Sequence, residues 1–198
     1  LCGLLLAYAY PDRIARRKPS GGYVMSNGRG AAFAAGSQPL SAAPYIVAVE
    51  LDDQGTESRI DLAAPVEEAD LRKHFPARII REPLVEWDSA AQTVRGVIRE
   101  KLGAITLKET SLTRIDPSDL LSAMLDGIAR EGVQMLPWTK ATRQLQQRLL
   151  FMHMHDRSWP DCPDEALLTR AHEWLAPFLE GMRSRNDLQR LNLAAVLE

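Results

Sequence analysis

Apolar positions along the chain change their spacing near Asp116, and this change predicts two kinds of structure. Before Asp116, apolar residues occur in short runs rich in Val, Ile and Tyr, and Gly, Pro, Asn or Asp separates these runs at intervals typical of strands and turns. After Thr110, apolar residues recur three and four positions apart, as they do on one face of a helix. The pattern therefore predicts a mainly β first half followed by a helical module.

The first half contains three candidate hairpins. Asn27-Gly28 joins the first pair and suits a type I′ turn, because both residues tolerate positive φ. Asp53-Gln54-Gly55 joins the second pair, whose second strand alternates polar and apolar residues and should have one solvent-facing side. The last strand of the third pair is long enough to bend at Gly96 or Gly103. The paired segments are residues 23–26 with 29–33, 45–51 with 58–62, and 79–87 with 93–107.

A short helix is expected between the second and third hairpins. Residues 67–75 carry acids in their first turn, have Leu71 and Phe75 four positions apart, and precede Pro76, which would end the helix. Five or six short strands with one helix before the last hairpin are compatible with a small oligonucleotide/oligosaccharide-binding (OB) barrel, although other small barrels share this pattern. We therefore predict an α+β protein in which a small OB-like β-barrel, over residues 20–109, precedes an all-helical C-terminal module, residues 110–198.

The helical module is expected to begin with a helix that has clear signals at both ends. Asp116-Pro117 combines an N-cap residue with proline at the first helical position, and Gly132 is placed as a C-terminal cap. Residues 164–180 should form a later helix with a kink at Pro177, and Ser184 to Asp187 resembles a capping box. A middle helix over residues 139–154 should turn Leu145, Leu149, Leu150 and Met152 inward and Arg143, Gln146, Gln147 and Arg148 outward.

Composition and charge narrow the class of protein. The 198 residues are 45% hydrophobic and 25% charged, close to the average for soluble globular proteins, and no window reaches the roughly 18 apolar residues of a membrane span. Cys2 and Cys162 lie far apart without metal-type spacing, which fits free thiols in the cytoplasm. The net charge of −2 gives no general argument for nucleic acid. Cations nevertheless gather near the start of the chain and acids over residues 50–70, so a phosphate-facing surface, if these runs are more than solvated faces, should lie near the N-terminus.

Motifs for catalysis and metal binding are absent from the sequence. It holds no GxxxxGK[ST] loop, no DEAH-type carboxylate pair and no GxSxG elbow, so we expect no catalytic residue and no cofactor in this chain. His153 and His155 are two positions apart, which points their rings to different sides of a helix, so we expect no metal site.

Candidate nucleic-acid-binding residues come from the cations and from the first hairpin. Tyr23 and Phe33 could stack bases beside Arg29, or point into the barrel. The tryptophans are better assigned to packing. Cations that share one face of the later strand could follow phosphates or only make an edge strand soluble. The candidate RNA-binding residues are Arg13, Arg16, Arg17, Tyr23, Asn27, Arg29, Phe33, Arg95, Arg99 and Lys101.

Several stretches resemble one protein family in the same order along nearly the whole chain. AYPDRIARRK and GGYVMSNGRGAAF resemble the region just after the helicase core of HrpB-type proteins, bacterial relatives of the DEAH-box ATP-dependent RNA helicases. PYIVAVELDD, RIDLAAPVEEADLRKHFP, VEWDSAAQTVRG, LGAITLKE, MLPWTKATRQLQQRL, WPDCPDEALL and WLAPFL extend the resemblance. Because the chain opens on Leu1 within an apolar helical run, we expect further chain upstream, with residues 1–19 as the end of a preceding helical bundle domain.

The resemblance implies an accessory C-terminal region of an ATP-dependent RNA helicase. ATP, Mg²⁺, hydrolysis and 3′-to-5′ unwinding would then belong to motor domains upstream, and the barrel would bind single-stranded RNA weakly or help to close the RNA channel. The partners would be RNA and the upstream helicase core, with no membrane. The alternative is a protein-docking module without nucleic-acid contact, and an exposed apolar patch on the helical third would favour it. RNA or DNA preference stays open.

Overall fold

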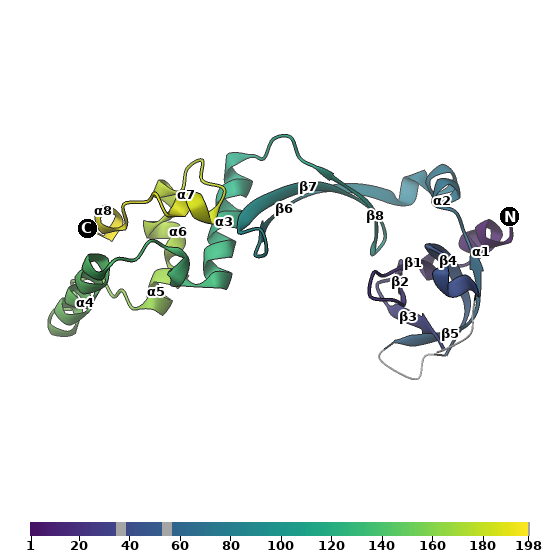
Figure 1. Cartoon of the computed structure of the whole chain (residues 1–198), viewed down its shortest axis with the longest axis horizontal. Helices are drawn as coiled ribbons and strands as arrows, with labels where there is room; N and C mark the ends of the chain where they lie inside the picture. The colour runs from purple at the N-terminus through teal and green to yellow at the C-terminus, as the bar shows by residue number, and fades with distance from the viewer. Residues whose placement is uncertain (35–38, 53–56, 198) are drawn as a thin grey trace. The chain divides into compact units, whose positions relative to one another are not determined.

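The computed structural model describes residues 1–34, 39–52 and 57–197 (Figure 1). The chain separates into two units. Unit 1 comprises Leu1–Glu82 and Ile98–Thr110, and unit 2 comprises Pro83–Val97 and Ser111–Glu198. No helix among the described residues is long and apolar enough to cross a membrane.

Five short strands of unit 1 close into a barrel. Neighbouring strands follow the order β1-β2-β3-β5-β4, and β4 closes the ring by pairing antiparallel with β1. The pair β3 and β5 is parallel and the other pairs are antiparallel. The strands are β1 (Ile14–Arg17), β2 (Tyr23–Met25), β3 (Gly30–Phe33), β4 (Tyr45–Asp52) and β5 (Ser58–Pro65). The predicted barrel is confirmed as a closed ring, but its strands span Ile14–Pro65 instead of residues 20–109.

The uninterrupted apolar run of the first half of the sequence forms strand β4, which is buried on both faces. Tyr45, Ile46, Val47 and Ala48 are all buried. Because successive side chains of a strand point to opposite faces, Ile46 and Ala48 join one apolar cluster with Tyr23, whereas Tyr45 and Val47 join a second cluster. The second cluster includes residues of α1 (Cys2–Ala9) and α2 (Glu68–His74). Both faces of β4 are therefore covered.

The first hairpin has a different turn from the predicted type I′. Gly28 has φ +90°, but Gln92 is the one non-glycine residue with positive φ among the described residues, so Asn27 is not left-handed. Gly28 N–H donates to Met25 O, and Met25 N–H donates to Arg29 O, each at 2.9 Å. These bonds define a three-residue loop with a glycine bulge. The second hairpin, β4 with β5, is confirmed, and its predicted turn at Asp53-Gln54-Gly55 lies outside the described residues.

A separate three-stranded sheet follows the barrel and α2. Its strands are β6 (Ile79–Asp88), β7 (Thr93–Leu102) and β8 (Ile105–Ser111), in the order β6-β7-β8. The predicted single arm over residues 93–107 is therefore two strands, β7 and β8. They meet at Gly103, whose φ of +59° is the left-handed conformation that glycine adopts readily. The bend expected at Gly103 is a chain reversal.

The C-terminal part of unit 2 is helical, as predicted, whereas Pro83–Val97 contributes strand residues of β6 and β7. The helical part contains α3 (Pro117–Glu131), α4 (Lys140–His155), α5 (Asp164–Thr169), α6 (Ala171–Trp174), α7 (Arg185–Leu188) and α8 (Leu193–Leu197). Leu120, Met124 and Ile128 of α3 are buried in a cluster with Trp87. Gly127 permits this contact, because a Cβ there would lie 2.5 Å from the Trp87 ring. The predicted ends of α3 are confirmed in position, with Asp116 before it and Gly132 after it at φ +89°, although the Asp116 side chain makes no capping hydrogen bond to the described backbone.

The predicted helix over residues 164–180 is wrong in one respect. It is split into α5, α6 and a 3₁₀ turn, Ala176–Phe178, and the first break falls at Arg170 instead of Pro177. Leu167, Ala171, Leu175 and Leu179 are nevertheless all buried at four-residue spacing. The four-residue spacing of buried positions therefore continues through the segment, although the helical backbone is interrupted. The predicted capping box is confirmed, since Ser184 Oγ accepts from Asp187 N–H and the Asp187 side chain accepts from Ser184 N–H.

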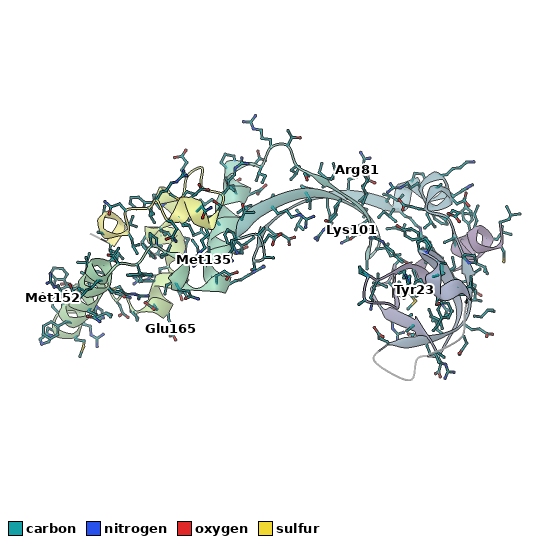
Figure 2. The ribbon with its side chains drawn as sticks, in the orientation of Figure 1. Tyr23, Arg81, Lys101, Met135, Met152 and Glu165 are labelled. Atoms are coloured by element: carbon teal, nitrogen blue, oxygen red, sulfur yellow. The ribbon has the colours of Figure 1, made fainter. Side chains whose placement is uncertain are left out.

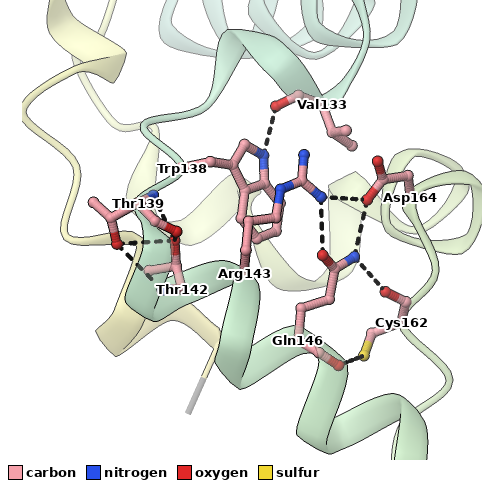
Figure 3. A network of polar contacts seen from close by, with 8 residues as sticks. All are labelled: Val133, Trp138, Thr139, Thr142, Arg143, Gln146, Cys162 and Asp164. Atoms are coloured by element: carbon pink, nitrogen blue, oxygen red, sulfur yellow. Dashed lines mark hydrogen bonds and ion pairs between the residues drawn. The ribbon is translucent and has the colours of Figure 1, made fainter.

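The prediction for helix α4 is confirmed for Leu149 and Leu150, which pack against a buried apolar cluster, but it is wrong for Gln146 and Met152. Gln146 is only 5% exposed, whereas Met152 is 37% exposed. Gln146 Nε2 donates to Cys162 O and to Asp164 Oδ1, each at 2.9 Å (Figure 3). This hydrogen bond holds the pKa of the Asp164 carboxyl below its ordinary value. Arg143 also donates to Asp164, at 2.8 Å, and lies 3.8 Å over the Trp138 ring. Polar contacts therefore fix α4 to the segment that follows it.

Candidate nucleic-acid interface

A groove of about 380 Å³ lies within unit 1 where three turns of the chain meet. The turns are Pro11–Arg13, the β2–β3 turn, and the β7–β8 turn at Gly103. Its lining residues are Pro11, Asp12, Ser26, Asn27, Arg78, Ile80, Leu102 and Gly103.

Ser26 ties these three turns together. Its Oγ donates to Pro11 O at 2.7 Å, its N–H donates to Ile14 O at 2.7 Å, and its carbonyl accepts from Ala104 N–H at 2.8 Å. Gly103 is required at this junction, because a Cβ there would lie 2.2 Å from Ser26 O. The backbone around the groove is therefore held by hydrogen bonds from both sides.

The groove combines groups that suit a nucleotide. The exposed guanidinium of Arg78 can bind a phosphate. The exposed Asn27 side chain can donate from its NH₂ group to a base edge, while its Oδ1 accepts from Arg29 N–H at 2.9 Å. Ile80 is 61% exposed and offers an apolar surface. Asp12 adds a carboxylate, which accepts hydrogen bonds from base amino groups but opposes phosphate. This arrangement favours one or two unpaired nucleotides over a long phosphate track.

Two of the four candidate N-terminal arginines donate to backbone carbonyls within unit 1. Arg13 Nη1 donates to Val49 O at 2.6 Å, and its guanidinium lies 5.2 Å from the Tyr10 ring. Arg16 donates to Thr106 O, which connects β1 to β8. Arg17 and Arg29 are the exposed members of the predicted set in this region. The cluster of cations therefore contributes fewer groups to a ligand than the sequence suggested.

The predicted stacking role of Tyr23 is not supported by its position. Tyr23 is 1% exposed and lies in the barrel (Figure 2). Its hydroxyl lies 2.9 Å from the carbonyl oxygens of both Leu40 and Ala43. Burial raises the pKa of this phenol. Phe33 is half-buried and packs edge-on against Tyr23, with ring centroids 5.8 Å apart. Tyr23 thus fills the barrel, because the inward side of the three-residue strand β2 carries both Tyr23 and Met25.

Comparisons with known proteins connect this chain with an RNA helicase. No family model matches it. It is 34% identical over 198 residues to the ATP-dependent RNA helicase HrpB of Escherichia coli (strain K12), which covers 98% of this chain and 24% of that protein. The chain is related to HrpB-type helicases. The crystal structures of the E. coli DExH-box NTPase HrpB and of the DEAH/RHA helicase HrpB match it with 33% and 32% identity and TM-scores of 0.51 and 0.50.

The match to HrpB runs through both units but spans only part of that protein. The two crystal structures cover 99% and 100% of this chain, and the chain covers 25% of each of them. This quarter-length match is consistent with a C-terminal region of an HrpB-type helicase.

The cations of β7 in this HrpB-related chain are engaged by acids. Arg99 Nε lies 2.7 Å from Glu109, and Lys101 Nζ lies 3.1 Å from Glu82. The third candidate of this strand, Arg95, is exposed and lies in unit 2. The predicted phosphate track along β7 therefore does not consist of three unpaired cations.

The buried Glu100 of β7 collects two further cations. Its carboxylate lies 2.6 Å from Arg72 and 2.7 Å from Arg81, and Figure 2 labels Arg81 near Lys101. The hydrogen bond from Arg72 holds the pKa of Glu100 below its ordinary value. Arg72 and Arg81 thus stabilise the sheet.

The histidines form no metal site in the part of the chain that the structure describes, where no cluster of three or more His, Cys, Asp or Glu side chains could hold an ion. His153 Nδ1 lies 2.5 Å from Trp159 O, and His155 Nδ1 lies 2.9 Å from Phe151 O. Both rings therefore contact the backbone.

Sequence reasoning missed most of the groove. Arg78, Ile80 and Ser26 belong to segments far apart in the sequence, and no spacing connects them. Asn27, in the turn of the first hairpin, is the one sequence-predicted candidate that lines the groove.

Proposed function

We propose that this chain is an accessory C-terminal region of an ATP-dependent RNA helicase similar to HrpB. The observation that supports this proposal is the 34% identity over 98% of the chain, which spans about a quarter of the relative. Because the sequence lacks a phosphate-binding loop, ATP and Mg²⁺ would bind in motor domains upstream, which would hydrolyse ATP and unwind RNA in the cytoplasm. The partners of the chain are then this helicase core and RNA.

Within this role, the barrel unit binds single-stranded RNA through its groove. The closed five-strand order with one parallel pair supports an OB-like barrel, a fold that binds oligonucleotides. Arg78 holds a phosphate, Asn27 contacts a base edge, and Ile80 packs against the base. Arg17 and Arg29 add weaker, exposed phosphate contacts. Binding is weak and insensitive to RNA sequence, because one cation and one amide make too few base contacts to distinguish the bases. On this proposal residues 1–13 adjoin a preceding helical domain, the RNA-binding barrel begins with β1 at Ile14 instead of at residue 20, and residues 110–198 form the helical module.

The test is fluorescence anisotropy of a labelled single-stranded RNA oligonucleotide, measured with the intact chain between low and physiological salt. Each phosphate contact to a single strand adds about 0.7 to the slope of log affinity against log salt. Arg78→Ala should flatten the slope by about that amount. Arg130→Ala, at an exposed cation of α3, is the charge-matched control and should leave the slope unchanged. Equal slopes for Arg78→Ala and the unmodified chain would remove the groove from the proposal.

A further inference from the structure

Helix α4 carries a hollow of about 590 Å³ that is lined largely by apolar side chains. We name it the α4 hollow and define it by Leu145, Arg148, Phe151, Met152 and Trp159. Phe151 is 58% exposed and Trp159 is 41% exposed. Soluble proteins seldom leave two large aromatic side chains so exposed in one place, and such patches mark sites where a partner binds.

The wall of the α4 hollow is built by a turn after the helix. Trp159 N–H donates to Asp156 O at 3.1 Å, and Trp159 O lies 2.5 Å from His153 Nδ1. Asp156 Oδ1 accepts from Ser158 N–H at 2.9 Å, which fixes the turn. Trp159 is therefore held beside α4 by several contacts, and the hollow is a formed feature of unit 2.

Charge around the hollow indicates what fills it. The helix from Lys140 to His155 contains three Lys or Arg residues and no acid. Arg148 lines the hollow directly, and Arg157 Nη1 lies 3.0 Å from His153 at the end of the helix. A second copy of this chain related by two-fold symmetry would present the same positively charged face of α4, and like charges on facing surfaces repel. The occupant is therefore anionic as well as apolar.

We propose that the α4 hollow binds an amphipathic helix of a partner protein, with apolar residues on one face and acids on its flanks. Its apolar side chains insert between Phe151, Met152 and Trp159, and its acids pair with Arg148. Met152 supports this assignment, because a flexible methionine adapts to inserted side chains. RNA fits less well, since most of the exposed surface of the lining is apolar and Arg148 is the one cation among the described lining residues. This site is distinct from the groove of unit 1 and does not depend on RNA binding.

The experiment uses the intact chain with isotope-labelled methionine methyl groups. Of its six methionines, Met25, Met124 and Met135 are buried, and Met154 is 77% exposed two positions beyond Met152, on another side of the helix. The probe is a synthetic amphipathic helical peptide with leucine on one face and glutamate elsewhere. We expect the Met152 signal to shift while the signals of Met154 and the buried methionines stay in place.

Variants and competing probes separate the alternatives. Phe151→Ala should weaken peptide binding about tenfold, and Phe178→Ala, at another exposed aromatic residue of unit 2, should leave it unchanged. Replacing the glutamates of the peptide with lysine should weaken binding at least about tenfold. The proposal is overturned if Met152 does not respond, or if the lysine peptide binds equally well. It is also overturned if Met152 responds to single-stranded RNA, to anionic vesicles or to protein concentration instead of the peptide.

Discussion

Strand β4 and helix α4 differ in the kind of side chain that each of them buries. Strand β4 buries four consecutive apolar residues, Tyr45–Ala48, and divides them between two clusters. Helix α4 has Thr142 and Gln146 as its buried residues and leaves Phe151 exposed. The hydrophobic effect therefore dominates in β4, whereas α4 combines the half-buried Leu149 and Leu150 with capping and side-chain hydrogen bonds.

This contrast shows which surface has been left for binding. In unit 1, Arg13, Arg16 and Lys101 contact backbone carbonyls or acids, so charge mostly stabilises the fold. In unit 2, apolar area that could have stabilised α4 remains exposed beside Arg148. A helix that leaves apolar side chains exposed gains less stability from burial, and a partner that covers these side chains would add that stability on binding.

The largest expected effect comes from truncating one core residue in each unit. Leu175→Ala in unit 2 and Ile46→Ala in unit 1 remove fully buried side chains, and each should lower the free energy of unfolding by about 2–5 kcal/mol. Hydrogen exchange measured by mass spectrometry should accelerate within the unit that carries the change. Leu5→Ala, at an exposed leucine, is the control. Equal acceleration in both units would show that they unfold together and would weaken the comparison.

Local signals explain how much of this fold the sequence could predict. The ends of α3 are marked by Pro117 and Gly132, which act within one turn, and the continuous apolar run of β4 indicates a strand covered on both faces. The helical break at Arg170 has no such signal. Periodicity predicts that Gln146 faces solvent. Its burial depends instead on Cys162 and Asp164, which lie 16 and 18 residues away in the sequence. Burial of a polar residue depends on tertiary partners that periodicity does not reveal.

A smaller effect should follow from removing the buried amide that holds α4. Gln146→Leu leaves the carbonyl of Cys162 without this donor, and an unsatisfied buried acceptor costs about 1–3 kcal/mol of unfolding free energy. Gln147→Leu, at the exposed neighbouring position, should be close to neutral. Urea unfolding followed by tryptophan fluorescence provides the measurement. A neutral Gln146→Leu variant would mean that apolar packing holds α4 after all.

The same variant should change how stability depends on pH. The folded pKa of Asp164 lies below its ordinary value of 3.8, chiefly because Gln146 donates to it. The unfolded chain therefore binds more protons in acid, so this stabilisation is present above about pH 3.8 and is lost as pH falls through the folded pKa. Gln146→Leu should make the decline below pH 3.8 shallower. An unchanged decline would assign it to other carboxyls, such as Asp187, whose pKa is also lowered.

The candidate groove was less predictable than the fold, for a physical reason. It forms where Ser26, Arg78 and Gly103 meet, and hydrogen bonds across more than ten residues of chain create the meeting point. Cation clusters in the sequence instead directed attention to Arg16 and Lys101, whose partners are Thr106 and Glu82. Charge in a sequence does not reveal whether a cation faces solvent or another residue.

The smallest expected effect is the change in the salt slope of RNA binding on removing Lys101, a cation already paired with an acid. Lys101 is half-buried and 3.1 Å from Glu82, so it would have to leave that acid before it could bind phosphate. Lys101→Ala should therefore change the salt slope of RNA binding much less than the roughly 0.7 expected for Arg78→Ala. Glu82→Gln, which weakens the hold on Lys101, should steepen the slope slightly, and anisotropy with the same oligonucleotide measures all three variants. If Lys101→Ala flattens the slope as much as Arg78→Ala, then β7 offers phosphate contacts despite its ion pairs, and the contrast between engaged charge in unit 1 and exposed apolar area in unit 2 no longer holds.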